Sequence, residues 1–232
     1  MPSMGPLLPV FALAAGVVVS CVAAAGVPHV DIPSCSRGKG FLEYSKSVPE
    51  RTAFPRTQVG LCYSDLYLHI NFVAHDEVNF YFNSSQGTND DIWKYEVMEA
   101  FIQKGKDDPK SYLEFEVNPD NVTYQAFIFN PSKNRADGAP FEHAFIKDPA
   151  AIGIQSTTIL DRDGRLWMSN VQIPLGLFGV YRDKAKGTLW RMNFFRTVVD
   201  PKTYPQQELG AWSPPDKANF HITPFFGIAR FV

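Results

Sequence analysis

The chain has 232 residues, of which 45% are hydrophobic and 20% are charged, and its 22 basic and 24 acidic residues give a formal net charge of −2. This composition excludes a disordered or collagen-like chain. It leaves no surplus of positive charge for a phosphate backbone, so we expect no nucleic-acid partner. Aromatic side chains make up 14% of the sequence, and because rings suit pleated sheets this content favours an all-β fold.

Residues 1–25 are predicted to be a signal peptide that is removed from the mature protein. Residues 7–25 are almost all apolar, and the stretch ends in small residues that fit a cleavage site. The alternatives are a retained membrane anchor and a lipoprotein modified at Cys21, but the uncharged N-terminus argues against a lipobox. We therefore expect a secreted, extracellular protein that begins near Gly26 and has no membrane contact after cleavage.

The two remaining cysteines, Cys35 and Cys62, are expected to form one disulfide, because secreted proteins fold in an oxidising compartment. The alternative is a pair of free buried thiols. Two N-glycosylation sequons, which begin at Asn83 and Asn121, agree with a secretory route. No linker, repeat or low-complexity tract interrupts residues 26–232, so we predict a single domain. We also expect a monomer.

Apolar and polar side chains that alternate with a period of two predict the strands. Leu66, Leu68, Ile70 and Phe72 share one face of the first strand, and further candidates follow at 95–103, 113–117, 123–129, 152–160, 166–173, 189–198 and 226–231. Turn residues separate them, and only residues 174–179 are expected to form a short helical turn. Short strands of this kind predict two antiparallel sheets packed as a jelly-roll-like β-sandwich.

Most enzyme motifs are absent from the sequence, including G-x-S-x-G, H-E-x-x-H, the P-loop and C-x-x-C. The five histidines include no i, i+4 pair, so a zinc site is not expected. Glu114 and Glu116 share one face of a predicted strand, and Glu99 lies on a neighbouring strand. Paired carboxylates of this kind could serve a glycoside hydrolase, an enzyme of carbohydrate catabolism. The alternative is a solvated strand face.

Three parts of the sequence carry a resemblance to a known family. They are the acidic loop, Trp and strand at 90–102, the segment YLEFEVNP at 112–119, and the segment from GAWSP at 210–214 to the closing Phe-Gly at 226–227. In this order and spacing they resemble the family-9 carbohydrate-binding modules over residues 65–231. The resemblance implies a β-sandwich that holds structural calcium and clamps a sugar between two aromatic rings, without catalytic residues of its own.

Three residues match the sugar site of that family, and a fourth stands at a position where this chain departs from it. By the resemblance, Trp93 and Phe220 are the two rings of the clamp, and Glu99 accepts hydrogen bonds from the sugar hydroxyls. Glu116 stands where the characterised sugar-binding members carry an Arg, and Phe220 is a Phe rather than a Trp. Covering one apolar face of a pyranose with a ring is worth about 2 kcal/mol, so micromolar binding of a wall polysaccharide or its oligosaccharides is the expected scale.

These residues also have structural alternatives. Trp93 could instead cover the core below the loop at 90–91, Glu99 could pair with a basic side chain, and Phe220 could be a core residue. The implied calcium has candidate ligands in Asp76 and Asp91, because hard cations bind loop carboxylates. The alternative for both is a solvated turn.

A third function comes from haem-binding domains with a similar sandwich fold. In such domains Met and His side chains ligate the iron. The residues that could be nominated are Met98 with His221 or His143, although nothing in their spacing compels this choice.

Overall fold

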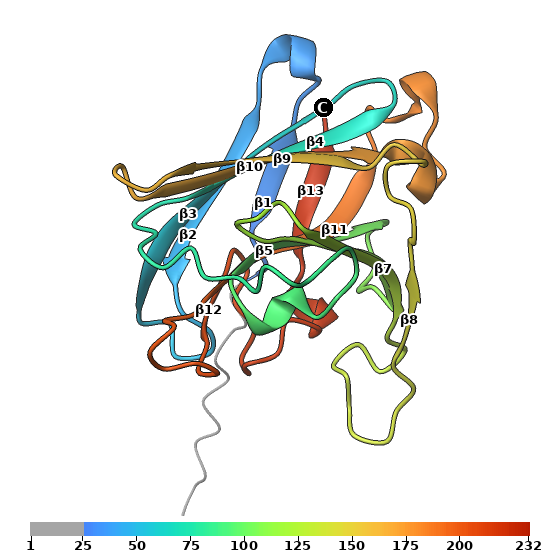
Figure 1. The fold of residues 1–232 in the computed structure, drawn as a ribbon. Helices are drawn as coiled ribbons and strands as arrows, with labels where there is room; N and C mark the ends of the chain where they lie inside the picture. The colour runs from blue at the N-terminus through green and yellow to red at the C-terminus, as the bar shows by residue number, and fades with distance from the viewer. Residues whose placement is uncertain (1–25) are drawn as a thin grey trace, which may run out of the picture.

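The structure is a computed structural model, and it describes residues 26–232. Residues 1–25, which contain the predicted signal peptide and Cys21, lie outside the described residues. The described chain forms thirteen β-strands and five 3₁₀-helices and has no α-helix (Figure 1). In this part of the chain, no helix is long and apolar enough to cross a membrane.

The larger sheet has eight strands. Seven follow the order β1-β13-β11-β5-β6-β7-β8, and β12 pairs with β11. All of these pairs are antiparallel except β1 with β13. The strands are β1 (His29–Ile32), β5 (Val97–Lys104), β6 (Ser111–Val117), β7 (Thr123–Phe129), β8 (Glu142–Phe145), β11 (Leu189–Val198), β12 (Glu208–Ala211) and β13 (Gly227–Phe231).

The smaller sheet has five antiparallel strands in the order β2-β3-β4-β10-β9. It lies across the larger sheet (Figure 1), and the two sheets enclose the main apolar core. The predicted two-sheet β-sandwich is therefore confirmed, with one parallel strand pair as the exception. The strands are β2 (Gly40–Lys46), β3 (Ala53–Tyr63), β4 (Tyr67–Ala74), β9 (Gln155–Asp161) and β10 (Leu166–Pro174).

The short helices lie between the strands. The predicted helical turn is present, and Gly179 ends it with a φ of 67°, a left-handed conformation that glycine adopts without strain. The other four helices were not expected from the sequence. The five are η1 (Cys35–Arg37), η2 (Ile92–Lys94), η3 (Leu175–Phe178), η4 (Arg182–Lys184) and η5 (Thr223–Phe225).

The central strands β5, β6, β7 and β11 of the larger sheet are buried on both faces, and this arrangement positions the site. Along β5, Met98 and Ala100 pack between the sheets, whereas Val97 and Phe101 belong to a second apolar cluster on the outer face. The loops at 75–96, 130–141 and 212–226 cover this outer face. They are tied down by backbone contacts such as Thr223 N–H to the Lys133 carbonyl at 2.8 Å. Functional side chains can therefore lie on an outer face that is partly closed by loops.

Some predicted boundaries were wrong. The strand expected from residue 95 begins at Val97, because the Glu96 N–H instead donates to the Tyr81 carbonyl in the preceding loop. Leu66 was expected on a buried strand face, but it is 57% exposed and precedes β4. Strands β1, β2, β3, β8 and β12 were not predicted.

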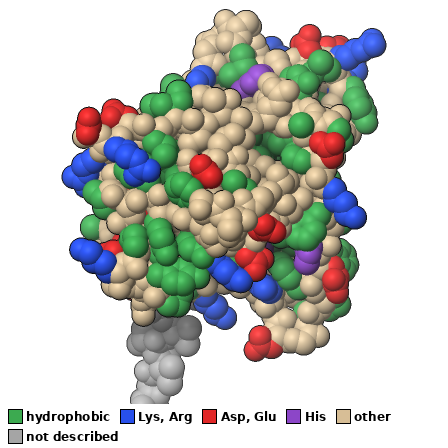
Figure 2. Space-filling view, viewed as in Figure 1, with side chains coloured by type: hydrophobic (Ala, Val, Ile, Leu, Met, Phe, Trp, Pro, Cys, Tyr) green, Lys and Arg blue, Asp and Glu red, His purple; other side chains and the backbone are tan. Residues whose placement is uncertain are grey.

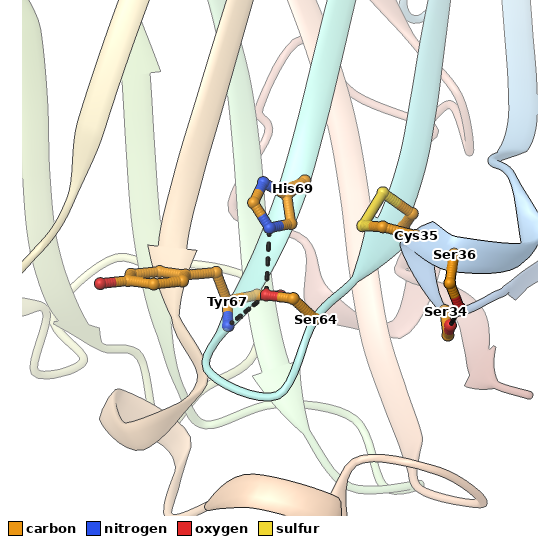
Figure 3. Close-up of a disulfide and its surroundings, with 7 residues drawn as sticks. Ser34, Cys35, Ser36, Ser64, Tyr67 and His69 are labelled. Atoms are coloured by element: carbon orange, nitrogen blue, oxygen red, sulfur yellow. Dashed lines mark hydrogen bonds between the residues drawn. A yellow bond between two sulfur atoms is a disulfide. The ribbon is translucent and has the colours of Figure 1, made fainter.

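The structure confirms the disulfide between Cys35 and Cys62, whose Cα atoms lie 4.9 Å apart. It joins η1 to β3 beside the turn that leads into β4 (Figure 3). In that turn the Ser64 Oγ accepts the Tyr67 N–H and lies 3.1 Å from Nε2 of His69. The bridge therefore fixes the N-terminal segment to the C-terminal end of β3 in the smaller sheet.

Removing this bridge is expected to destabilise the protein. The disulfide closes a loop with a sequence separation of 27 residues, for which the chain-entropy model gives about 3–4 kcal/mol. We expect the variant with both Cys35→Ala and Cys62→Ala to lose that much unfolding free energy in urea denaturation. Reduced wild-type protein is the control and should behave in the same way. An unchanged urea midpoint would contradict a stabilising role.

Candidate functional site

A cleft of about 1200 Å³ opens on the outer face of the larger sheet. Strands β5, β6, β7 and β11 contribute its floor, and the loops around 83–95, 135–145, 204–209 and 218–221 contribute its walls. The structure brings all four sequence-predicted sugar residues into this cleft, together with a third carboxylate. They are Trp93, Glu99, Glu116 and Phe220, with Glu114.

Strand register places four of the outer-face side chains in one row across the sheet. Phe195 of β11 pairs with Glu99 of β5, Glu99 with Glu116 of β6, and Glu116 with Tyr124 of β7. Directly paired residues of neighbouring strands point to the same face. The floor of the cleft therefore presents the carboxyl groups of Glu99 and Glu116 and the ring of Tyr124 side by side, whereas Phe195 is fully buried at the end of this row.

Trp93 lies on the wall of the cleft. It lies in η2 and is 45% exposed, so it does not cover the core below the loop. Gln207 Nε2 donates to the Trp93 carbonyl oxygen at 2.7 Å, and Lys94 Nζ lies 5.3 Å from the ring centroid. These contacts hold the backbone and the ring in place while part of the indole stays open to solvent.

Phe220 is half-buried and lies on top of the sheet. Its ring stacks on Phe195 with a centroid distance of 4.1 Å and an interplanar angle of 20°. The same loop is anchored by the His221 carbonyl oxygen, which accepts a hydrogen bond from Asn130 Nδ2 at 2.8 Å. Phe220 therefore packs on the sheet, as a core residue would, and also lines the cleft, where a clamp ring is expected.

The three glutamates are buried together. Glu99, Glu114 and Glu116 each offer an oxygen within 4.8 Å of the other two, and their exposed fractions are 4%, 6% and 1%. This contradicts a solvated strand face, because loops close over the outer side of β6. In the described part of the chain it is also the one group of three or more His, Cys, Asp and Glu side chains that could share a metal ion.

Burial raises the pKa values of all three carboxyl groups, and repulsion between the carboxylates adds to the rise at Glu99 and Glu116. Burial, with the charge of Glu114, raises the pKa of Glu99 well above its usual range. Burial likewise raises the pKa of Glu116, which also faces the charges of Glu99 and Glu114. Burial raises the pKa of Glu114 to about 8, although the nearby Arg135 charge opposes the rise. The cluster therefore holds protons near neutral pH when no cation is bound.

His221 lies beside this cluster but does not neutralise it. Its Nδ1 is 2.6 Å from the Tyr112 hydroxyl, and its Nε2 is 4.0 Å from Glu114. Burial, with the Arg135 charge, lowers the pKa of His221 to about 3. The imidazole is therefore neutral at physiological pH and positions the neighbouring side chains rather than pairing with a carboxylate.

The raised pKa of Glu114 predicts a pH-dependent stability. Its carboxyl binds its proton more tightly in the folded than in the unfolded state, so the folded protein loses stability as pH rises from about 4.5 to about 8. The facing groups are Glu99, Glu116, Arg135 and His221. Glu114→Gln removes this penalty. We expect the free energy of unfolding of the variant to exceed that of wild type by roughly 2–4 kcal/mol at pH 8 and to equal it near pH 4.5.

Calorimetric unfolding of both proteins at the two pH values, in phosphate buffer with EDTA, measures this difference. Each comparison is made at a single pH, so other groups with raised pKa values, such as Glu96, affect both proteins equally. A variant whose advantage is the same at both pH values would contradict the prediction.

The two calcium candidates lie in loops. Asp91 Oδ2 bonds Lys94 Nζ at 2.6 Å, and Asp76 is an exposed residue with a left-handed φ of 55°. Neither belongs to a group of three His, Cys, Asp or Glu side chains that could share a metal ion in residues 26–232. Calcium at these two positions stays a prediction from the resemblance.

The haem candidates lie on different sides of the larger sheet. Met98 is fully buried in the core between the two sheets, whereas His221 and His143 line the cleft on the outer face. No common iron site joins Met98 to either histidine. The alternation along β5 separates them, since neighbouring positions of a strand face opposite ways.

Several aromatic cleft residues were missed by the sequence analysis. Tyr124 shares the outer face of β7 with Ala126 and Ile128, so the alternation in that strand could have identified it. Tyr95 and Tyr204 stack with a centroid distance of 5.2 Å beside Trp93. They come from loops, where no periodic pattern signals that they meet. The cleft is therefore lined by more rings than the two predicted.

Comparisons with known proteins agree with this architecture. No family model matches the chain. A protein of Arthroderma benhamiae named "Extracellular protein" is 56% identical over 220 residues, which are 95% of this chain and 97% of the relative. A solved structure from Bacteroides uniformis, provisionally described as a carbohydrate-binding protein, aligns with a TM-score of 0.66 at 15% identity over 89% of this chain and all of its own.

Two solved structures of a family-9 carbohydrate-binding module from Caldicellulosiruptor kristjanssonii also align, both at 15% identity over 88% of this chain. The complex with cellotriose has a TM-score of 0.56 over 93% of its chain, and the complex with glucose 0.57 over 95%. These alignments show that this chain has the fold of the family-9 carbohydrate-binding modules, as the sequence resemblance predicted.

Proposed function

We propose that this chain, which belongs to the same family as the Arthroderma benhamiae extracellular protein, is a secreted carbohydrate-binding protein without catalytic activity. It clamps one sugar unit of a wall polysaccharide or oligosaccharide between Trp93 and Phe220. The observation that carries the proposal is that these two rings and the buried carboxyl of Glu99 line one cleft. The rings cover the apolar faces of a pyranose, and the carboxyl oxygen accepts hydrogen bonds from its hydroxyl groups.

Calorimetric titration with glucose, cellobiose, xylobiose and the corresponding disaccharides of amino sugars tests the proposal. We expect saturable heat with at least one of them, with a dissociation constant on the order of micromolar. The absence of heat for every sugar at millimolar concentration, with and without calcium, would contradict sugar binding.

Secretion is supported by the apolar N-terminal stretch, by the disulfide between Cys35 and Cys62 and by the name of the relative. Expression in a eukaryotic host should deliver a product to the medium whose first residue lies near Gly26. Enzymatic deglycosylation should lower its mass if the sequons at Asn83 and Asn121 are used. A product that stays in the cell with its N-terminus intact would contradict secretion.

A glycoside hydrolase is the second candidate. The observation that favours it is the closeness of Glu99, Glu114 and Glu116, because retaining glycosidases place two carboxyl groups about 5–5.5 Å apart. Release of reducing sugar from xylan or glucan, lost in Glu99→Gln, would establish it. No release by wild-type protein would leave binding as the function.

A further inference from the structure

The floor of the cleft carries acidic groups that no protein cation pairs with. Glu99, Glu114 and Glu116 are each at least nine-tenths buried and meet at one point. Within residues 26–232, no Lys or Arg forms an ion pair with any of the three. Buried carboxyl groups ionise only at a high cost without a counter-charge, so a ligand that brings positive charge can displace their protons and pair with the carboxylates.

Neither of the two cations on the cleft wall forms an ion pair with the cluster. Lys94 Nζ bonds Asp91 at 2.6 Å. The Arg135 guanidinium lies over the Phe141 ring at 4.4 Å, and its charge acts on Glu114 without a direct contact. On the face shown in Figure 2, acidic and basic side chains are interspersed, without one large patch of either sign.

A second observation at the floor points to a ligand. Glu116 is 1% exposed, and its Oε2 has no hydrogen-bond partner in the protein. Buried polar atoms almost always have a partner, and an unpartnered one lowers stability. Because Glu116 lines the cleft, a ligand that brings a hydrogen-bond donor into the cleft can supply the partner that this oxygen lacks.

We propose that the cleft binds an amino sugar, a glucosamine unit of a β-1,4-linked oligosaccharide, through its ammonium group. An ammonium has three N–H donors, and three acceptors at about 2.8 Å around a tetrahedral nitrogen lie about 4.6 Å apart. The oxygens of Glu99, Glu114 and Glu116 lie within 4.8 Å of one another. Each of the three carboxyl groups can therefore accept one N–H.

The rings around the floor suit the same ligand. Tyr124 pairs with Glu116 in the row across the sheet and lines the cleft, and Phe220 lines it on top of the buried Phe195. Aromatic faces attract a desolvated cation and also cover the apolar face of a pyranose. A calcium ion, by contrast, takes six to eight oxygen ligands, and these neighbours offer mainly rings.

The inference rests on the proposed function, since it names the class of sugar for the same cleft. Three disaccharides that differ only at C2 distinguish the amino-sugar inference from sugar binding in general. They are β-1,4-diglucosamine with an ammonium, N,N′-diacetylchitobiose with an acetamide, and cellobiose with a hydroxyl. Titrations are made at a pH of about 6, at which the amine is charged. We expect diglucosamine to bind wild-type protein at least about tenfold more tightly than the other two.

Variants of the buried glutamates then test whether these residues cause the preference for diglucosamine. Glu116→Gln, a nearly isosteric change, should reduce the preference for diglucosamine to about threefold or less, and Glu99→Gln should act in the same way. Glu142→Gln is the matched control, because Glu142 is exposed on β8 between two cleft residues but does not line the cleft. It should bind as wild type does, and circular dichroism checks that each variant is folded.

The outcomes are distinct. Equal or tighter binding of cellobiose overturns the amino-sugar inference and leaves sugar binding intact. No binding of any disaccharide overturns both. Heat with calcium or manganese that is lost in Glu116→Gln, without any preference for diglucosamine, overturns the inference in favour of a metal site.

Discussion

Replacing Trp93 with Ala is expected to weaken sugar binding by about thirtyfold while leaving the protein folded. The indole is one of the two proposed plates, and losing about 2 kcal/mol of covered apolar surface weakens binding by about thirtyfold. The side chain is 45% exposed, so its removal should change the unfolding free energy by less than about 1 kcal/mol.

Calorimetric titration with the best-binding disaccharide, together with thermal unfolding, measures both effects. Trp93→Phe is the control variant, because it keeps a smaller ring and should recover part of the affinity. Unchanged affinity in Trp93→Ala would show that the sugar does not use this wall. A large loss of stability would assign the indole to the core.

The largest loss of stability is expected from Arg196→Met. Arg196 and Glu77 are fully buried, and Nη2 of the arginine donates to Oε2 of the glutamate at 2.8 Å. Arg196 also donates to the carbonyl oxygens of Arg56 and His75, so it joins β11 to strands of the smaller sheet. Removing it leaves the Glu77 charge buried without its partner, which costs about 3–5 kcal/mol.

Urea denaturation of Arg196→Met should show this loss, and the double variant with Glu77→Gln should recover much of it. The substituted amide keeps an oxygen for the N–H groups of Asn79 and Phe80, which Glu77 accepts at 2.7 and 3.0 Å. A double variant as unstable as Arg196→Met alone would show that packing, not an unpaired charge, sets the cost.

The fold was largely predictable because the central strands alternate cleanly. Leu113, Phe115 and Val117 predicted the inner face of β6, and the structure places all three in the core. Strand β3 was not predicted for a physical reason. In β3 the burial pattern has no period of two beyond residue 58, so β3 does not show the apolar–polar alternation on which the prediction depended.

The resemblance predicted single residues of the candidate site, but the sequence did not predict how they are arranged. The resemblance nominated Trp93, Glu99, Glu116 and Phe220, and all of them line the cleft. Alternation alone left Glu116 either solvated or functional, because a strand pattern does not tell whether loops cover the polar face. Only the fold of the loops at 75–96 and 212–226 decides that the glutamates are buried.

The central claim is that a sugar lies between Trp93 and Phe220 with a carboxyl of the buried cluster at its edge. A crystal structure of the protein with its best-binding disaccharide tests this most directly. We expect a pyranose between the two rings, with a donor group of the sugar on Glu99. A sugar bound elsewhere, such as in the hollow of about 420 Å³ lined by His69 and Asn71 on the smaller sheet, would contradict the account.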